Sequence, residues 1–304
     1  ESSTFVTTDA VNHMEADCFL PGNIIYTEQH SLKTSNGSSS SILSGRMTEY
    51  GYYDGIGEGA MLNNPLGFVQ LSPAHVVVCD TGNHCLRLID RFSGMTTEFA
   101  GKCLTPGHRD GKYALFYSPN AAIIDVNNRH IIIVSDFSNN AIRTVHIYTR
   151  MVSTLLRSRI VGLNVLSITQ DFTSGDLFLI TVTGIYKSLH YGPSTLSTEL
   201  IAGGSSRGYK DGDLNQTEFH HISGMVKADN DLFLVADQSN NAIRLLDLKR
   251  QVSSTLKLCE SQQKCSSSFH TPRALLLTNG SLYIALHGAI RQYKGNLTSC
   301  YQIS

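Results

Sequence analysis

Three stretches of the chain repeat one pattern and decide the fold: VVVCDTGNHCLRL (76–88), IIIVSDFSNNAIRTV (131–145) and LFLVADQSNNAIRLL (232–246). Each begins with an apolar, β-prone run, continues with Asp-x-x-Asn, and ends on Ile or Leu followed by Arg. The interval from the Asp to the Arg is seven residues in every copy. Self-similarity at a long period indicates stacked supersecondary units.

Other pieces recur around this pattern. A strand opening occurs four times, and the first three precede a copy of the pattern: LNNPLGFVQL (62–71), FYSPNAAII (116–124), FHHISGMVK (219–227) and FHTPRALLL (269–277). Asp-Gly stands before three of these openings, at Asp54-Gly55, Asp110-Gly111 and Asp211-Gly212. A further strand follows the pattern, as in TEFAG (97–101) and STLLR (153–157). Four short strands joined by tight turns are typical of a propeller blade.

Two more units show the strands without the Asp–Asn turn, at 160–203 and 269–304. At the N-terminus, NIIYT, SLKTS and SILSG supply three strands, and STFVTT (3–8) is the candidate for the fourth. The sequence therefore predicts a single all-β domain over 1–304, a six-bladed β-propeller of four-stranded antiparallel blades. The predicted blades lie at about 1–45, 61–101, 116–157, 160–203, 218–258 and 269–304.

The Pro-x-Gly strand opening, the Asp-x-x-Asn-x-x-Ile-Arg segment and the Phe-Ala-Gly, Asp-Gly, Phe-x-x-Pro linker resemble NHL repeats. The resemblance is strong in the second, third and fifth units and faint in the others. It implies the propeller architecture, but NHL propellers differ from one another in function.

Composition excludes some classes of partner. Only 16% of the 304 residues are charged, the net charge is −1, and the linker charges are mixed in sign. A nucleic-acid footprint needs a basic face or stripe, so we expect no nucleic-acid partner. No run of about 18 apolar residues is present, so we expect no membrane insertion by this segment. The chain begins at Glu1 without Met, which we interpret as a mature or trimmed form.

The repeated Asp and Asn residues have two interpretations. A ring of metal-binding or catalytic carboxylates is one, and Asx side chains that satisfy backbone amides in a tight turn are the other. Three equivalent copies favour the second, with the Arg pairing to polar groups of a neighbouring blade. We therefore expect these residues to be structural, neither catalytic nor metal-binding.

Twelve histidines raise the alternative of a metal-dependent hydrolase or lyase acting in the central channel, with His220, His221 and His270 near its opening. In the NHL-like lyases that cleave hydroxyglycine peptides, the zinc histidines follow the strand-opening Pro. The matching positions here are Leu66, Asn120, Ser223 and Arg273, so the resemblance implies that this zinc set is absent. Three convergent N or S ligands are not apparent, and we expect no cofactor or metal.

The seven cysteines form no CxxC pair, and their placement predicts disulfides. Cys79 and Cys85 replace small residues of the equivalent blades and are expected to face each other. Cys259 and Cys265 flank one linker, and a bond from Cys18 to Cys300 would tie the chain ends where the ring closes. Cys103 remains, and a Cys85–Cys103 pair is an open alternative. Sequons stand at Asn36, Asn215, Asn279 and Asn296.

Disulfides and sequons favour an extracellular location, secreted or in a cell-surface ectodomain. We therefore predict a non-catalytic module that recognises an extracellular protein ligand or receptor. The candidate contacts are the Tyr and Arg residues of the linkers between blades, because these residue types are enriched at binding hot spots. They are Tyr50, Tyr52, Tyr53, Arg109, Arg207 and Tyr209.

Overall fold

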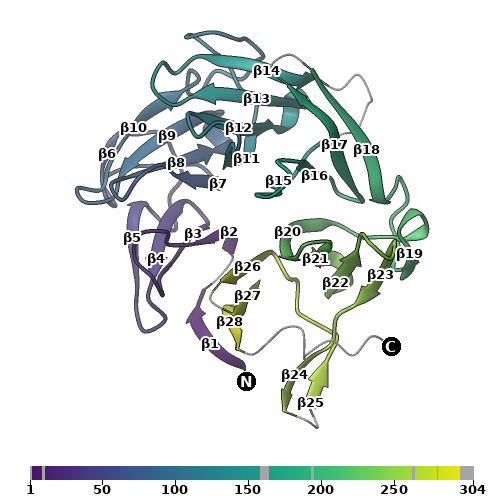
Figure 1. Cartoon of the computed structure of the whole chain (residues 1–304). Coiled ribbons are helices and arrows are strands. Elements are labelled where there is room, and N and C mark those ends of the chain that lie inside the picture. Colours follow the sequence, from purple (N-terminus) through teal and green to yellow (C-terminus); the bar gives the residue numbers. More distant parts are fainter. Residues whose placement is uncertain are drawn as a thin grey trace.

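The chain folds as a six-bladed β-propeller, as the sequence predicts (Figure 1). The structure is a computed structural model that describes residues 2–8, 11–157, 164–192, 195–261, 264–278 and 280–294. Each blade is an antiparallel sheet, and its first strand lies at the centre of the ring.

The first three blades follow one another along the chain. Their strands, from the centre outward, are β2 (Val11–Ala16), β3 (Ile24–Glu28), β4 (Ser31–Ser35) and β5 (Ser40–Gly45) in blade one; β7 (Pro65–Gln70), β8 (His75–Asp80), β9 (Cys85–Asp90) and β10 (Met95–Ala100) in blade two; and β11 (Pro119–Ile124), β12 (Ile131–Asp136), β13 (Ala141–His146) and β14 (Val152–Arg157) in blade three. The short β6 (Gly55–Ile56) pairs with the outer edge of blade two.

The other three blades complete the ring. Their strands are β15 (Ser167–Gln170), β16 (Leu177–Ile180), β17 (Gly184–Gly192) and β18 (Thr195–Gly203) in blade four; β20 (Ile222–Asp229), β21 (Leu232–Asp237), β22 (Ala242–Asp247) and β23 (Val252–Thr255) in blade five, with β19 (Gly212–Asp213) at its edge; and β26 (Ala274–Thr278), β27 (Ser281–Leu286), β28 (Ala289–Lys294) and β1 (Ser2–Thr7) in blade six. A separate hairpin joins β24 (Leu258–Ser261) to β25 (Lys264–Ser266).

The ring closes differently from the prediction. We placed residues 3–8 in blade one, but β1 pairs antiparallel with β28 and is the outer strand of blade six. The missing strand of blade one is β2, whose sequence VNHMEA contains three polar residues and lacks the expected apolar run. A strand from the N-terminus in the last blade fastens the two ends of the chain together. The C-terminal part of the predicted sixth blade, residues 295–304, lies outside the described residues.

The core is divided among the interfaces between blades. Six apolar clusters are present in the described chain, and each combines residues from two adjacent blades. The middle strands are buried on both faces because each blade is covered by its two neighbours, as β8 and β12 show. This explains why those strands are continuous apolar runs.

The up-and-down strand order gives the propeller two distinct faces. The linkers between blades and the turns between second and third strands lie on one face, here called the linker face. The turns between first and second strands and between third and fourth strands lie on the other, here called the turn face. Three 3₁₀ turns on the linker face follow the repeated Asp: η1 (Thr81–Asn83), η2 (Phe137–Asn139) and η4 (Gln238–Asn240). A fourth, η3 (Leu214–Gln216), lies in the linker before blade five. None of the helices in the described ranges is long and apolar enough to cross a membrane.

Candidate functional site

The repeated Asp, Asn and Arg form a buried clamp between each blade and the linker that precedes it. In blade three, Arg143 Nη1 donates to Asp136 Oδ2 at 2.6 Å and Nη2 donates to Asp110 Oδ1 at 2.7 Å. Asn139 Nδ2 donates both to Asp136 Oδ2 and to the carbonyl of Gly107 in the linker. The clamp therefore fixes the linker by side-chain hydrogen bonds as well as by backbone contacts.

The same clamp occurs in blades two and five. Arg87 joins Asp80 to Asp54, and Arg244 joins Asp237 to Asp211. The interval from the linker Asp to the Arg is 33 residues in all three blades. The Asp also accepts a backbone N–H, but from the strand opening that precedes its blade and not from its own turn as predicted. The Arg, however, pairs within its own blade and linker, not with a neighbouring blade.

The two carboxylates of a clamp lie in different surroundings. The turn Asp is fully buried, and burial raises the pKa of Asp80 to about 6 against the lowering by its hydrogen bonds to Asn83, Asn63 and Arg87. Burial also raises the pKa values of Asp136 and Asp237. At the linker Asp110, burial has the same tendency, but hydrogen bonds from Thr154 and Arg143 outweigh it and lower the pKa. Each Arg thus lies between one buried and one half-exposed carboxylate.

The clamps divide the predicted linker tyrosines into two kinds. The Tyr52 ring lies 4.8 Å from the Arg87 guanidinium, and its hydroxyl donates to Glu98 Oε1 at 2.6 Å. Burial is the largest cause that raises the pKa of Tyr52 to about 12, and the hydrogen bond and negative charge of Glu98 are the next largest. Tyr209 lies 5.0 Å from Arg244 and bonds Thr255 through its hydroxyl. Both tyrosines therefore cover a clamp.

Tyr50 and Tyr53 instead face solvent, with 67% and 63% of their surface exposed. Arg109 and Arg207 are also exposed, and the Arg109 Nε donates to the carbonyl of Tyr113 at 2.5 Å. The structure thus brings Tyr50 and Tyr53 together on the linker before blade two. Arg109 belongs to the next linker, and Arg207 and Tyr209 belong to the linker before blade five.

Sequence reasoning missed two exposed residues, Leu104 and Tyr117, that adjoin the same η1 turn as the Tyr50 linker. Leu104 is 60% exposed, and its N–H donates to the carbonyl of Asn83, whose side chain in turn bonds the Gly51 carbonyl. Tyr117 is 43% exposed and packs edge-on against His84 at 5.2 Å. Both residues border the η1 turn, as the Tyr50 linker does. We call Tyr50, Tyr53, Leu104 and Tyr117 the aromatic patch.

One disulfide is present in the described chain, between Cys85 and Cys103. The predicted Cys79–Cys85 bond is wrong, because Cys79 is opposite Leu86 while Cys85 is opposite Asp80. Neighbouring positions of paired strands point to opposite sheet faces, so the two thiols do not meet. Cys79 is a buried free thiol whose pKa is raised by burial. The open alternative, Cys85–Cys103, is the observed pair, and it fastens the Leu104 linker to β9.

The other predicted bonds are untested. The backbones of Cys259 and Cys265 stand opposite each other in the β24–β25 hairpin. Cys18 is exposed and has no disulfide within the described residues, and its predicted partner Cys300 lies outside them. Of the sequons, Asn36 is exposed on the turn face and Asn215 is exposed in η3. Asn279 and Asn296 lie outside the described residues.

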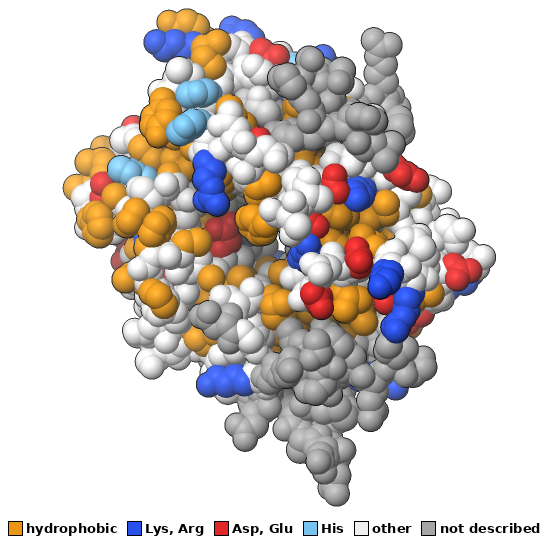
Figure 2. All heavy atoms as spheres, in the orientation of Figure 1, with side chains coloured by type: hydrophobic (Ala, Val, Ile, Leu, Met, Phe, Trp, Pro, Cys, Tyr) orange, Lys and Arg blue, Asp and Glu red, His pale blue; other side chains and the backbone are white. Residues whose placement is uncertain are grey.

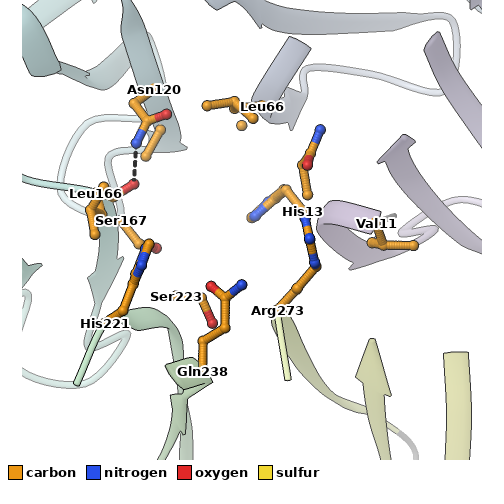
Figure 3. A pocket seen from close by; sticks show the side chains of 13 residues that line it. Val11, His13, Leu66, Asn120, Leu166, Ser167, His221, Ser223, Gln238 and Arg273 are labelled. Atoms are coloured by element: carbon orange, nitrogen blue, oxygen red, sulfur yellow. Dashed lines mark hydrogen bonds between the residues drawn. The ribbon is translucent and has the colours of Figure 1, made fainter. Parts of the chain in front are cut away.

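The central channel holds a cavity of about 250 Å³ that residues of all six blades line (Figure 3). One residue per blade stands at the second position of the strand opening: Asn12, Leu66, Asn120, Leu166, Ser223 and Arg273. Four of these are the positions that the sequence comparison with NHL-like lyases marked as channel positions. Ser167, which also lines the cavity, is the next residue in blade four. Because inner strands begin on the linker face, the cavity opens there.

Alternate members of this ring connect adjacent blades. Asn12 Nδ2 donates to the Pro65 carbonyl at 3.3 Å, Asn120 Nδ2 to that of Leu166 at 2.9 Å, and Ser223 Oγ to that of Pro272 at 2.8 Å. These bonds run from blade one to two, three to four, and five to six. The side chains of the other three members, Leu66, Leu166 and Arg273, make no such bond.

The histidines named for a channel metal are separated in the structure. His221 lines the cavity, His270 is exposed, and the N–H of His220 donates to Asp237 in the clamp. Burial lowers the pKa of His221, and Arg207, His220 and Arg273 lower it further. No group of three His, Cys, Asp or Glu side chains suited to a metal is present within the described ranges. A divalent cation beside Arg273 would also be repelled by the guanidinium.

The two halves of the turn face differ in character (Figure 2). Hydrophobic side chains gather at the left of the view, over β6 and blade two, where Ile56 and Met95 are paired and Phe92 is 80% exposed. Acidic and basic side chains alternate at the right of the same view. Ion pairs such as Lys227–Asp171 and Lys187–Asp176 account for the mixed charge in this half of the molecule.

No protein-family model matches the chain, and no curated protein matches it in sequence. Solved structures share its fold. An auxiliary nutrient binding protein from Bacteroides thetaiotaomicron has a TM-score of 0.68 at 13% identity, over 96% of this chain and 75% of that chain. A putative gluconolactonase has a TM-score of 0.62 at 10% identity, over 97% and 92% of the two chains.

Streptogramin B lyase has a TM-score of 0.58 at 11% identity and covers 96% of each chain. At such low identities the likeness establishes a common β-propeller fold. Proteins with this fold include binding proteins and enzymes, so function must be inferred from this chain's own surface. The NHL-type repeat remains a prediction.

Proposed function

We propose that this chain is a non-catalytic recognition module of an extracellular protein, secreted or part of a receptor or adhesion ectodomain, and that it binds a protein ligand through the aromatic patch. The exposure of Tyr50 and Tyr53 on a clamped linker carries the proposal. Arg87 donates to the Tyr53 carbonyl and Asn83 donates to the Gly51 carbonyl, so the backbone that presents both tyrosines is held on two sides.

Pre-ordered aromatic side chains favour binding. A tyrosine buries a large area with few rotatable bonds, and a fixed backbone lowers the entropy lost when the complex forms. Tyr50 also packs against His30 at 5.5 Å, which restricts its ring without covering it. Leu104 and Tyr117 extend the apolar surface on the far side of η1.

The Cys85–Cys103 bond supports an extracellular location, because disulfides persist in oxidising compartments. We expect the native protein to contain this bond and a second one between Cys259 and Cys265. Non-reducing peptide mapping of protein from its natural source checks both. Free thiols at Cys85 and Cys103 would contradict the extracellular proposal and favour a reducing compartment.

The binding surface is tested with Tyr50→Ala/Tyr53→Ala against a matched control, Phe92→Ala/Tyr148→Ala. The control removes two aromatic side chains, 80% and 71% exposed, from turns on the opposite face. A partner is first identified by measuring the intact propeller against purified extracellular domains. We then expect the linker-face variant to bind that partner at least about tenfold more weakly, as loss of hot-spot residues does, while the control retains wild-type affinity.

Tyr52 is excluded from this variant because its ring covers Arg87, and its loss would disturb the clamp. Thermal melts of both variants must match the wild type for the comparison to hold. Equal affinity of the folded linker-face variant and the wild type would rule out the aromatic patch. Weakening by the control alone would move the interface to the turn face.

A further inference from the structure

Half of the channel mouth carries polar side chains with no protein partner. Ser167 comes from blade four, His221 and Gln238 from blade five, and Arg273 from blade six, so the four side chains lie on consecutive blades (Figure 3). Within the described residues, none of these side chains makes a hydrogen bond. The Nε of Arg273 is buried and has no acceptor.

The contrast with the other ring members is direct. Asn12, Asn120 and Ser223 use their side chains to bond the next blade, and so they contribute to closing the ring. Arg273 stands at the equivalent position of blade six, and its side chain makes no such bond. Burying a polar nitrogen without an acceptor is costly, so the fold does not by itself explain the buried Nε of Arg273.

The lining of this cavity is also positively charged. Arg273 is in it, and no Asp or Glu is among the described residues that line it. His13, on the side toward which Arg273 points, contacts Glu15 at 3.4 Å. The cavity thus offers one guanidinium group without a carboxylate partner, beside hydrogen-bonding groups of neutral character.

We propose that this half of the channel mouth binds a small hydroxylated organic carboxylate, with the carboxylate on Arg273. An arginine fork matches a carboxylate in a planar, two-bond geometry. Gln238 and Ser167 bond the hydroxyl groups, and so does the Asn120 amide oxygen, which faces the channel while its nitrogen bonds Leu166. A cavity of about 250 Å³ holds only a small ligand, since drug-sized ligands take roughly 300–1,000 Å³.

Isothermal titration calorimetry of the whole chain with D-glucuronate tests the assignment. D-glucose provides the hydroxyl groups without the carboxylate, and sulfate provides an anion without the hydroxylated body. We expect saturable binding of glucuronate and at least tenfold weaker binding of both others. No measurable glucuronate binding at 10 mM (about the weakest affinity of interest) overturns the proposal. Equal binding of glucose or of sulfate overturns it as well.

Arg273→Gln identifies the anchoring group, and Arg129→Gln, an exposed arginine on the turn face, is the matched control. We expect Arg273→Gln to weaken glucuronate binding at least tenfold and Arg129→Gln to leave it unchanged. Gln238→Glu is a second variant that keeps the side-chain shape and places a competing carboxylate near Arg273, so it should also weaken binding. Wild-type affinity in a folded Arg273→Gln or Gln238→Glu protein would remove the site. These outcomes are independent of the aromatic patch, which both variants leave intact.

Discussion

Blades two, three and five differ from blades one, four and six in how each is joined to its linker. In the first group a fully buried Arg connects two carboxylates, one in the blade and one in the linker. In the second group the Arg position holds Lys33, Tyr186 or Arg291. The apolar interfaces between blades are present throughout, so the difference lies in the polar clamps.

Blade one retains a reduced form of the clamp. Glu28 ends β3 where blades two, three and five have Asp, and Lys33 bonds it at 2.9 Å with the Glu28 side chain only 1% exposed. The turn between them contains two residues, so the interval is five instead of seven. Lysine is a compact charge without a fork, and so it is less suited than Arg to bridging two carboxylates.

Blade six shows that an Arg at this strand position is not always buried. Its sequence Ala289-Ile290-Arg291 matches Ala141-Ile142-Arg143 of blade three, yet Arg291 is exposed. The difference lies in the residue that ends the second strand of the blade. The strand registers place Leu286 at the end of β27 where Asp136 stands at the end of β12, so blade six lacks the buried carboxylate. Burial of the guanidinium therefore depends on the buried carboxylate.

The largest expected effect comes from breaking one clamp. Arg143→Met leaves Asp136 buried without its cation, and removal of one partner from a buried ion pair costs roughly 3–5 kcal/mol. We expect a large loss in the free energy of unfolding, measured by urea denaturation at pH 7. Arg291→Met changes the same residue type in an exposed position and should cost less than about 0.5 kcal/mol. Similar losses in the two variants would mean that burial of the ion pair is not what separates the two groups of blades.

This comparison also explains how far the sequence predicts the structure. A buried polar group must keep its hydrogen-bond partners, so each clamp needs the same residues at the same intervals. These recurring residues make blades two, three and five recognisable in the sequence. Blade one has a Glu–Lys pair at a different interval, so its sequence does not show the repeated pattern. Its inner strand β2 is half polar and therefore carries no apolar signal of a strand. Closure by β1 was missed because short β-prone segments carry no mark of the sheet they join.

The candidate sites were predicted less well. The signal for the clamp partners Asp54, Asp110 and Asp211 is the constant 33-residue interval from each Asp-Gly to the Arg. The Cys79–Cys85 prediction is wrong because the small residues at the equivalent positions do not reveal the strand register, which places the two side chains on opposite faces of the sheet. The free side chains of the channel mouth come from three blades, and only Arg273 follows from the strand-opening position.

The two carboxylates of one clamp are expected to have smaller, opposite effects on the pH dependence of stability. Burial tends to raise the pKa of Asp110, but bonds from Thr154 and Arg143 lower it, so the folded protein favours the ionised form. Its contribution to stability is therefore present above the ordinary aspartate pKa and is lost as the pH falls through the lowered value. The Asp110 side chain is 48% exposed, so screening limits this contribution to below about 1 kcal/mol.

We expect Asp110→Asn to flatten the loss of stability on acidification, measured as urea midpoints from pH 7 to pH 3. Asp136→Asn is the matched variant for the buried carboxylate, whose pKa is raised by burial. A group with a raised pKa contributes stability at low pH that is lost as the pH rises through the raised value. Its replacement should therefore steepen the acid limb where Asp110→Asn flattens it. Parallel profiles in both variants and the wild type would show that the two carboxylates titrate alike, and the division of each clamp into a buried and an exposed half would then have no electrostatic consequence.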